Sequence, residues 1–188
     1  MPKPVLQIII GSTRPGRIGL PVAQWFDGVA RQQGDFDVEL VDLAEVALPL
    51  FDEPGHPLGR QYMHPHTVAW SATIDRADAF VFVIPEYNHS YNAATKNALD
   101  YLHVEWNYKP VGFVSYGGVA AGTRAQTALK PVMAALRMTP VVEAVNVPFV
   151  AQFIDDDGRF VPNEVLVLGA AGMLAELARM AAALRPLR

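Results

Sequence analysis

One nine-residue stretch of the chain, residues 11–19, concentrates side chains that bind phosphate. It reads Gly-Ser-Thr-Arg-Pro-Gly-Arg-Ile-Gly. Arginine guanidinium groups match phosphate oxygens in a two-pronged geometry, and the hydroxyls of Ser12 and Thr13 add hydrogen-bond donors. The glycines let the backbone approach a ligand closely. If a helix begins where the stretch ends, its free N–H groups and its dipole attract an anion as well. The stretch therefore predicts a phosphate cradle.

The spacing within this stretch narrows the kind of phosphate ligand. Gly11 and Gly16 have the spacing of a Walker motif, but Arg17 and Ile18 stand where Lys and then Ser or Thr are required. A nucleoside triphosphatase is therefore excluded. The dinucleotide fingerprint G-x-G-x-x-G is also absent, so Asp42, after the second apolar run, is expected to cap a loop and not to bind a ribose. A monophosphate ligand fits best.

Two further polar segments follow apolar runs. Residues 85–92 read Pro-Glu-Tyr-Asn-His-Ser-Tyr-Asn, in which Asn88 suits the edge of a polar heterocycle and Tyr87 its face. His89 stands beside them, either in contact with a substrate or solvated in a loop. Residues 115–122 contain Gly117 and Gly118, which allow close approach to a flat ligand or form a tight turn. Together the segments predict a site for a phosphorylated, planar ligand.

These segments need elements that bring them together. Apolar runs predict strands at 5–10, 36–43, 79–84, 111–115 and 140–147, and helices are expected at 20–33, 67–78, 93–105, 123–137 and 163–184. Such alternation predicts a doubly wound, five-stranded parallel sheet with helices on both faces. One domain, 1–188, is expected. Ligands of such folds bind at the carboxyl ends of the strands, where the three polar segments lie.

The remaining polar residues give weaker indications. Residues 47–66 hold four prolines and are expected to be irregular, either as a lid or contact surface or as a plain surface excursion. No metal site is expected, since no carboxylate or cysteine completes a ligand spacing with His56, His64 and His66.

Composition excludes several classes of protein. The chain has 188 residues and no cysteine, which excludes thiolate chemistry, disulfides and cysteine-ligated clusters. Its net charge of −4 argues against a nucleic-acid or anionic-membrane partner. The start lacks the features of a signal peptide, and the longest apolar run, 165–175, is shorter than the ~20 residues of a membrane span. A cytoplasmic protein is expected.

The chain resembles the NADPH-dependent FMN reductase family of flavodoxin-like flavoproteins, which includes quinone, azo-dye and chromate reductases. Three motifs carry the resemblance: GSTRPGRIG at 11–19, PEYNHSYNAATKNALDYL at 85–102 and SYGGVAAGTRAQ at 115–126. The resemblance implies a flavodoxin-like fold with strand order 2-1-3-4-5. It also implies bound FMN, NADPH or NADH as co-substrate, and a homodimer or homotetramer with the flavin near a subunit interface.

The resemblance also implies positions for the flavin. The phosphate positions lie in the first loop, the next group lies along the isoalloxazine ring, and the third loop completes the site. In order, these residues are Ser12, Arg14, Arg17, Ile18 and Gly19, with Thr13 added for its hydroxyl; Pro85, Glu86, Tyr87 and Asn88; and Ser115, Gly117 and Gly118. Many relatives carry Pro-Gly before the Lys96-Asn97 pair, whereas this chain has Asn-Ala-Ala-Thr at 92–95. The acceptor preference therefore stays open. Lys96 and Arg124 lie near helix starts and could serve packing, a subunit contact or an NADPH phosphate, and these options also stay open.

The expected activity is hydride transfer from a nicotinamide through bound FMN to a quinone, azo, flavin or similar acceptor. The cofactor supplies the chemistry, so no side chain is required as an acid or base. The alternative is a flavodoxin-like FMN module that transfers electrons without oxidising nicotinamide directly. Arg14, Arg17 and the mild net charge favour the reductase, because flavodoxins are usually strongly acidic. A third option, a scaffold with a vestigial pocket, predicts a colourless protein.

Overall fold

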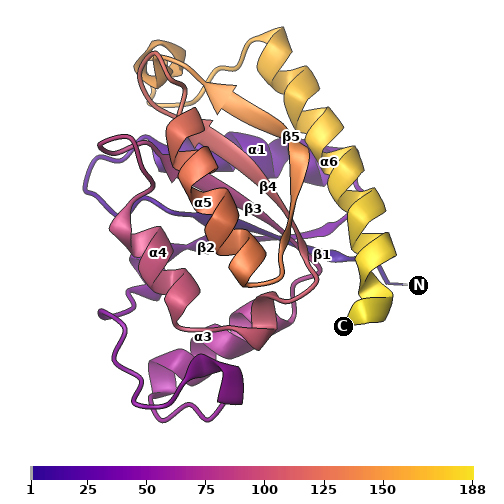
Figure 1. Cartoon of the computed structure of the whole chain (residues 1–188). Helices are drawn as coiled ribbons and strands as arrows, with labels where there is room; N and C mark the ends of the chain where they lie inside the picture. The colour runs from indigo at the N-terminus through magenta and orange to yellow at the C-terminus, as the bar shows by residue number, and fades with distance from the viewer. Residues whose placement is uncertain (1) are drawn as a thin grey trace.

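The five strands form one parallel sheet in the order β2-β1-β3-β4-β5, as predicted (Figure 1). The structure is a computed structural model, and it describes residues 2–188. The strand bounds are Val5–Ile10 for β1, Asp37–Asp42 for β2, Ala79–Pro85 for β3, Pro110–Tyr116 for β4 and Thr139–Val147 for β5. The apolar, β-branched runs that predicted strands therefore do form the sheet.

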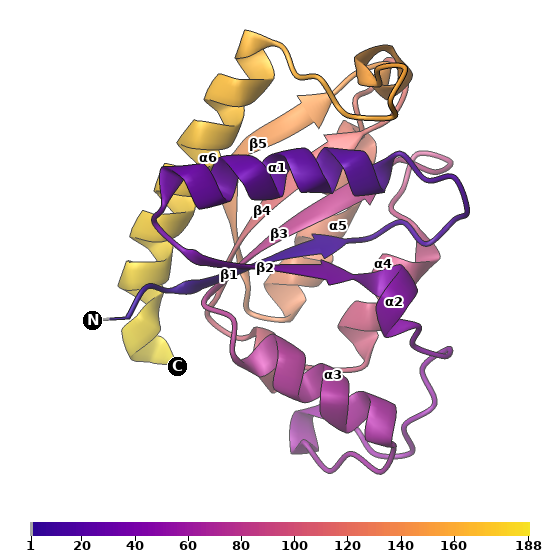
Figure 2. The same cartoon turned by 180° about the vertical axis from the view of Figure 1, so that it is seen from behind.

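Helices cover both faces of this sheet. They are α1 (Gly19–Gln33), α2 (Leu43–Val46), α3 (Pro65–Asp75), α4 (Ala93–Asp100), α5 (Thr123–Ala135) and α6 (Glu164–Leu184). Figures 1 and 2 show α1 and α6 on one face and α3, α4 and α5 on the other. Single 3₁₀ turns occur at Pro57–Gly59, Val104–Trp106, Val150–Phe153 and Arg185–Leu187.

The alternation of strand side chains divides the core into two layers. In β1, Leu6, Ile8 and Ile10 pack with α1 and α6, whereas Ile9 faces the opposite layer with α3, α4 and α5. Every residue of β3 is buried, since the strand lies in the middle of the sheet with helices on both sides. The apolar excess of the composition is therefore used in a sheet buried on both faces.

Helix α4 is shorter than the predicted 93–105, because it ends at Asp100. The chain then turns so that Tyr101 and Trp106 enter the core, where both are fully buried. Trp106 donates its indole N–H to the carbonyl of Leu99 at 3.3 Å, and its ring lies 5.0 Å from that of Phe80. A continuous helix would spread these aromatic side chains around its axis, so burial of the rings decides where α4 ends.

Two other element boundaries also differ from prediction. Asp42 caps the unpredicted helix α2 by accepting a hydrogen bond from the Ala44 N–H at 2.9 Å, so its expected role as a cap is confirmed. Helix α3 begins at Pro65, as suits a proline in the first turn. It ends at Asp75, three residues earlier than predicted, where Lys109 takes the last carbonyls of the helix.

The predicted irregular segment 47–66 ends two residues early, because Pro65 and His66 belong to α3, and it contains the 3₁₀ turn Pro57–Gly59. Carboxylates fasten residues 47–64 to the domain. Glu53 accepts hydrogen bonds from the N–H groups of Met63 and His64, both at 2.9 Å. Asp52 accepts one from the Tyr101 hydroxyl at 3.0 Å and lies 3.2 Å from His66.

Within residues 2–188, no group of three or more His, Cys, Asp or Glu side chains is arranged to hold a metal ion.

The last helix is apolar on more than its buried side. By length and composition alone, the stretch Glu164–Leu187 is sufficient to cross a membrane. Core helices of folded domains pass the same test, and α6 packs Leu166, Met173 and Leu177 into the core beside β4 and β5. Helix α6 therefore serves as a cover of the sheet in this fold, and its composition is weak evidence for a membrane segment.

Candidate active site

The loops that follow β1, β3, β4 and β5 meet at the carboxyl edge of the sheet and enclose a cleft of about 130 Å³. All three polar segments singled out in the sequence contribute to it, as the alternation of strands predicted. The lining residues are Arg14, Arg17, Ile18, Pro85, Glu86, Tyr87, Tyr116, Gly117 and Val150. The fold therefore assembles one site from segments that lie about 100 residues apart along the chain.

The N-terminus of α1 is the first feature of this site. The helix begins at Gly19 without a side-chain cap and without an acidic residue in its first turn. Its partial positive charge is therefore not compensated. Ser12 lies beside it, only 1% exposed, and its Oγ has no hydrogen-bond partner within residues 2–188. A buried, unsatisfied hydroxyl next to an uncapped helix N-terminus suits an anionic ligand.

Gly19 fits this position because two hydroxyls crowd it. A Cβ atom there would contact Ser12 Oγ and lie 2.5 Å from the hydroxyl oxygen of Tyr116. Burial raises the pKa of Tyr116 to about 12, so the phenol stays protonated at neutral pH and remains a hydrogen-bond donor. The loop after β1 and the end of β4 therefore place two hydroxyls at the start of α1.

The two arginines of the phosphate loop have different surroundings. Arg14 is exposed, and its guanidinium carbon lies 5.9 Å from the ring centroid of Tyr87, within the range of a cation–π contact. No ion pair engages Arg14 within the described chain. Arg17 instead pairs with the carboxylate of Asp42, the cap of α2. Both line the cleft, but only Arg14 brings an uncompensated positive charge to it.

Residues of the loop after β3 form the opposite wall. The N–H of Glu86 donates to the Tyr116 carbonyl at 3.0 Å, which fastens this loop to the neighbouring strand. The Glu86 carboxylate accepts hydrogen bonds from the backbone N–H of Arg124 at 3.2 Å and from its Nη1 at 2.9 Å. Arg124 therefore balances a carboxylate at the cleft wall. This ion pair within the chain answers in part the question of its role that the sequence left open.

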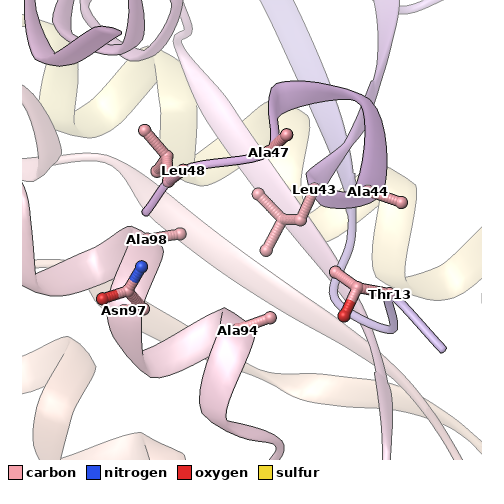
Figure 3. A pocket seen from close by; sticks show the side chains of 8 residues that line it. All are labelled: Thr13, Leu43, Ala44, Ala47, Leu48, Ala94, Asn97 and Ala98. Atoms are coloured by element: carbon pink, nitrogen blue, oxygen red, sulfur yellow. The ribbon is translucent and has the colours of Figure 1, made fainter. Parts of the chain in front are cut away.

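Six of the predicted ligand residues are not among those that line the cleft. Ser12 and Gly19 lie at the start of α1, as described above, and the other four lie in the loops. Thr13 lies at the edge of a separate hollow of about 370 Å³, opposite Ala94 and Asn97 of α4 (Figure 3). Asn88 occupies a left-handed turn position with φ of 50° in the turn between Tyr87 and Ser90. For both residues, a role in ligand binding stays a prediction.

The other two residues off the cleft belong to the loop after β4. Ser115 is fully buried, and its hydroxyl donates to the carbonyl of Ala121 or to Asn146 Oδ1, each at 2.9 Å. The carbonyl of Gly118 accepts hydrogen bonds from the N–H groups of Ala121 and Phe149. Ser115 and Gly118 thus hold the loop in shape, and their assignment as ligands also stays a prediction.

Two lining residues were missed in the sequence analysis. Tyr116 stands inside the third motif, and an aromatic residue between a buried strand and paired glycines could have marked it. Val150 gave no signal, because it sits in an apolar run after the last strand. Its N–H donates to the Gly117 carbonyl at 3.2 Å, so only the topology of the sheet reveals its place in the site.

The segment Asn-Ala-Ala-Thr at 92–95 has a structural role in this chain. Asn92 is buried and donates from Nδ2 to the Gly11 carbonyl at 2.6 Å, while its Oδ1 accepts from the Thr95 hydroxyl at 2.8 Å. Lys96 pairs with Asp100 one helical turn later. Asn92 therefore ties the start of the phosphate loop to the N-terminus of α4.

These features fit a flavin mononucleotide. The uncapped α1 N-terminus, the unpartnered Ser12 hydroxyl and the charge of Arg14 suit its single phosphate. Tyr87 and the backbone at Gly117 suit a flat ring. The cleft is smaller than the roughly 300–1,000 Å³ usual for small-molecule sites, so it encloses a part of such a ligand and not the whole.

Solved structures share this fold. The flavoenzyme NAD(P)H:(acceptor) oxidoreductase FerB from Paracoccus denitrificans superposes with a TM-score of 0.74 at 19% identity, covering 96% of this chain and 98% of that one. RosB, solved with a bound riboflavin-5′-phosphate derivative, superposes with a TM-score of 0.73 at 12% identity, covering 97% of this chain and 81% of that one. At these identities the likeness establishes the fold alone.

Sequence comparison establishes the family. An NAD(P)H-dependent FMN reductase of Schizosaccharomyces pombe is 42% identical over 149 residues, which cover 77% of this chain and 74% of that protein. A second one, from Nectria sp, is 37% identical over 153 residues, covering 78% and 76%. The sequence model of the NADPH-dependent FMN reductase family matches residues 5–152. The chain therefore belongs to the NADPH-dependent FMN reductase family.

Proposed function

We propose that the protein is an oxidoreductase that passes hydride from NADPH or NADH through bound FMN to a small acceptor such as a quinone, an azo compound or a free flavin. Family membership supports this, as do relatives named FMN-dependent NADPH-azoreductase in Staphylococcus saprophyticus and probable NADPH:quinone oxidoreductase 1 in Oryza sativa. The observation that carries the proposal is the uncapped α1 N-terminus with the unpartnered Ser12 hydroxyl at the cleft.

The residues divide into two groups by the part of FMN they suit. Ser12, Arg14 and the first turn of α1 would hold the phosphate. Tyr87 and the backbone at Gly117 would flank the ring. Arg17 stands within the same cleft but shares its charge with Asp42, so we assign it a smaller part in phosphate binding.

FMN, when bound, supplies the hydride-accepting and hydride-donating chemistry. The protein contributes position and electrostatics. The protonated hydroxyl of Tyr116 is available as a donor inside the cleft. Arg124 pairs with the Glu86 carboxylate at the cleft wall. Without this partner, the negative charge of Glu86 would oppose the addition of electrons to a nearby ring. No side chain is assigned the role of acid or base.

We further propose a cytoplasmic homodimer or homotetramer. Large apolar side chains on the 47–68 segment support self-association, because Leu50, Met63 and Val68 are all more than half exposed. Light scattering on the protein as it elutes from a size-exclusion column measures the mass of the oligomer directly. A monomer at all concentrations would contradict this part of the proposal and leave the activity untouched.

The decisive experiment is the visible spectrum of the FMN-loaded protein without oxygen, before and after addition of NADPH. Rapid loss of the visible flavin absorbance, within about a second, is expected of the reductase. Retention of the flavin with slow or absent bleaching would favour the electron-transfer module. Failure to retain FMN would refute both and favour a scaffold with a vestigial pocket.

A matched pair of variants connects this spectrum to the proposed site. Arg14→Ala removes the uncompensated charge at the cleft. Arg159→Ala removes an arginine that is well exposed and pairs with Asp157 in the hairpin after β5. The first variant is expected to lose FMN on dilution and the second to retain it. Equal retention by both would place the phosphate elsewhere.

A further inference from the structure

A second cleft, of about 520 Å³, lies at the opposite end of the sheet. It is formed where α3 ends, where β3 and β4 begin and where the last turn of the chain, Arg185–Leu187, folds back. The lining residues are Arg60, Asp75, Arg76, Ala77, Asp78, Val104, Glu105, Asn107, Tyr108, Lys109, Arg185, Leu187 and Arg188. The strands β3 and β4 have seven residues each, so roughly 20 Å separates it from the FMN cleft.

The charge of this lining is opposite to that of the chain. Five cationic side chains and three carboxylates line the cleft, although the whole protein carries a net charge of −4. One third of the 15 lysines and arginines of the chain are gathered there. Such a concentration in one concave site favours an anionic ligand.

Three of the five cationic side chains of this cleft form ion pairs with described residues, and two do not. Arg60 lies between Asp75 and Glu105, at 3.2 Å from each, and Arg188 pairs with Asp78 at 2.8 Å. Arg76 is held by Glu39, a residue outside the cleft. In residues 2–188, the remaining two cations, Lys109 and Arg185, form no ion pair.

Lys109 is the buried member of this pair. It is only 4% exposed, and its Nζ donates to the carbonyls of Ile74 and Asp75 at 2.8 and 3.0 Å. An ammonium group has three N–H donors, so one is left for a ligand. The nitrogen lies over the Phe80 ring, 5.5 Å from its centroid, and this cation–π contact helps to hold the side chain in place. A fixed, buried cation is an efficient anion contact, since little entropy is lost on binding.

Apart from Asn107 and the Tyr108 hydroxyl, the uncharged part of the lining is apolar. Val104, Leu187 and the ring of Tyr108 contribute carbon surface, and Arg137 fixes the Tyr108 hydroxyl with a hydrogen bond of 3.0 Å. The volume lies within the roughly 300–1,000 Å³ of small-molecule sites. A bare inorganic ion would leave most of this space unfilled.

We propose that this cleft is a second ligand site, for an organic anion that joins a carboxylate or phosphate group to a small apolar body. The Lys109 ammonium and the Arg185 guanidinium bind the anionic group, and Val104, Tyr108 and Leu187 contact the body. The site stands apart from the FMN cleft and does not depend on the proposed reductase activity.

Calorimetric titration of the FMN-loaded protein tests the proposal with three probes of similar size. Benzoate and phenyl phosphate carry the two possible anionic groups, and benzyl alcohol is their neutral counterpart. Either anion is expected to bind at one site per chain, at least about tenfold more tightly than benzyl alcohol. The stronger of the two anions identifies the head group. Equal binding of all three, or no binding, would overturn the proposal.

Charge-reversal variants locate the binding. Arg185→Glu changes an exposed side chain without an ion pair, so the fold is expected to persist. It should weaken binding of the better anion about tenfold or more. Arg159→Glu, on the distant hairpin, is the matched control and should leave the affinity within about twofold. If both variants bind alike, the anion sits elsewhere and the assignment is wrong. FMN absorbance, unchanged in both, shows that the first cleft is intact.

Discussion

The crowding around Gly19 predicts that the effect of Gly19→Ala on the free energy of unfolding changes sign when the crowding atoms are removed. Gly19 lies in the first turn of α1 and does not have a left-handed backbone, so alanine is sterically compatible with the local conformation. At such positions Gly→Ala usually stabilises a protein by about 0.4–1 kcal/mol, because the unfolded chain loses freedom. Here the new Cβ would lie 2.5 Å from the Tyr116 hydroxyl oxygen and also contact Ser12 Oγ. Overpacking of this kind costs about 1–3 kcal/mol.

The net expectation for Gly19→Ala is therefore a loss of about 1–2 kcal/mol in the free energy of unfolding. The substitution is then repeated in a Ser12→Ala/Tyr116→Phe background, which removes both crowding oxygens. There it should stabilise the protein by up to about 1 kcal/mol. Urea unfolding of the FMN-free protein, followed by tryptophan fluorescence, measures both changes.

A matched control shows whether the assay detects a Gly→Ala gain at all. Gly172 lies within α6, and no atom comes within 4 Å of a Cβ built there. Gly172→Ala should stabilise the protein by about 0.5–1 kcal/mol. The reasoning fails if Gly19→Ala stabilises the wild-type chain. It fails equally if the loss is the same in the background without the two oxygens.

Three further predictions follow from charged groups. Arg14→Ala should raise the FMN dissociation constant about tenfold, measured by flavin fluorescence, while Arg159→Ala should change it by less than twofold. Arg124→Ala leaves the Glu86 carboxylate unbalanced, so FMN should bind several-fold more weakly. Adding Glu86→Gln to this variant should restore the affinity. An unchanged affinity for FMN in the single variant would mean that the Glu86 charge does not act at the cleft. Burial lowers the pKa of Lys109 from 10.5 to about 8. Between these values the unfolded chain binds more protons than the folded one, so the free energy of unfolding should rise with pH by up to about 1.4 kcal/mol per pH unit. Lys109→Met should lack this rise in pH-dependent urea unfolding, and a parallel rise in the variant would assign it to other groups.

The parallel sheet and the meeting point of the loops could be predicted from the residue pattern because their causes are local, whereas the strand order came from the family resemblance. Buried parallel strands appear as continuous apolar runs, and polar segments after them must meet at one edge. Helix ends were less predictable. The end of α4 depends on where Trp106 finds a core, and the end of α3 on Lys109, a residue 34 positions later in the chain.

Individual site contacts were harder to predict than the site itself. Residue types showed that Ser115 and Arg17 could bind a ligand, but not that Asn146 and Asp42 would engage them first. Competition of this kind depends on tertiary neighbours. The same limit applies to Val150, which has no polar group and reaches the cleft only because β5 ends beside β4.

Net charge is a poor guide to the small anions that this chain can bind, because pairing acts locally. The sequence carries more carboxylates than cations, which argues against a broad nucleic-acid surface. At the FMN cleft, however, Asp42 and Glu86 each occupy an arginine, and Arg14 is left uncompensated beside an uncapped helix. In the cleft at the opposite edge of the sheet, Lys109 and Arg185 likewise form no ion pair with the described residues. An anion responds to the cations that stay unpaired within a Debye length, roughly 10 Å, and not to the sum over the chain. Two anion sites in an acidic protein are therefore physically consistent.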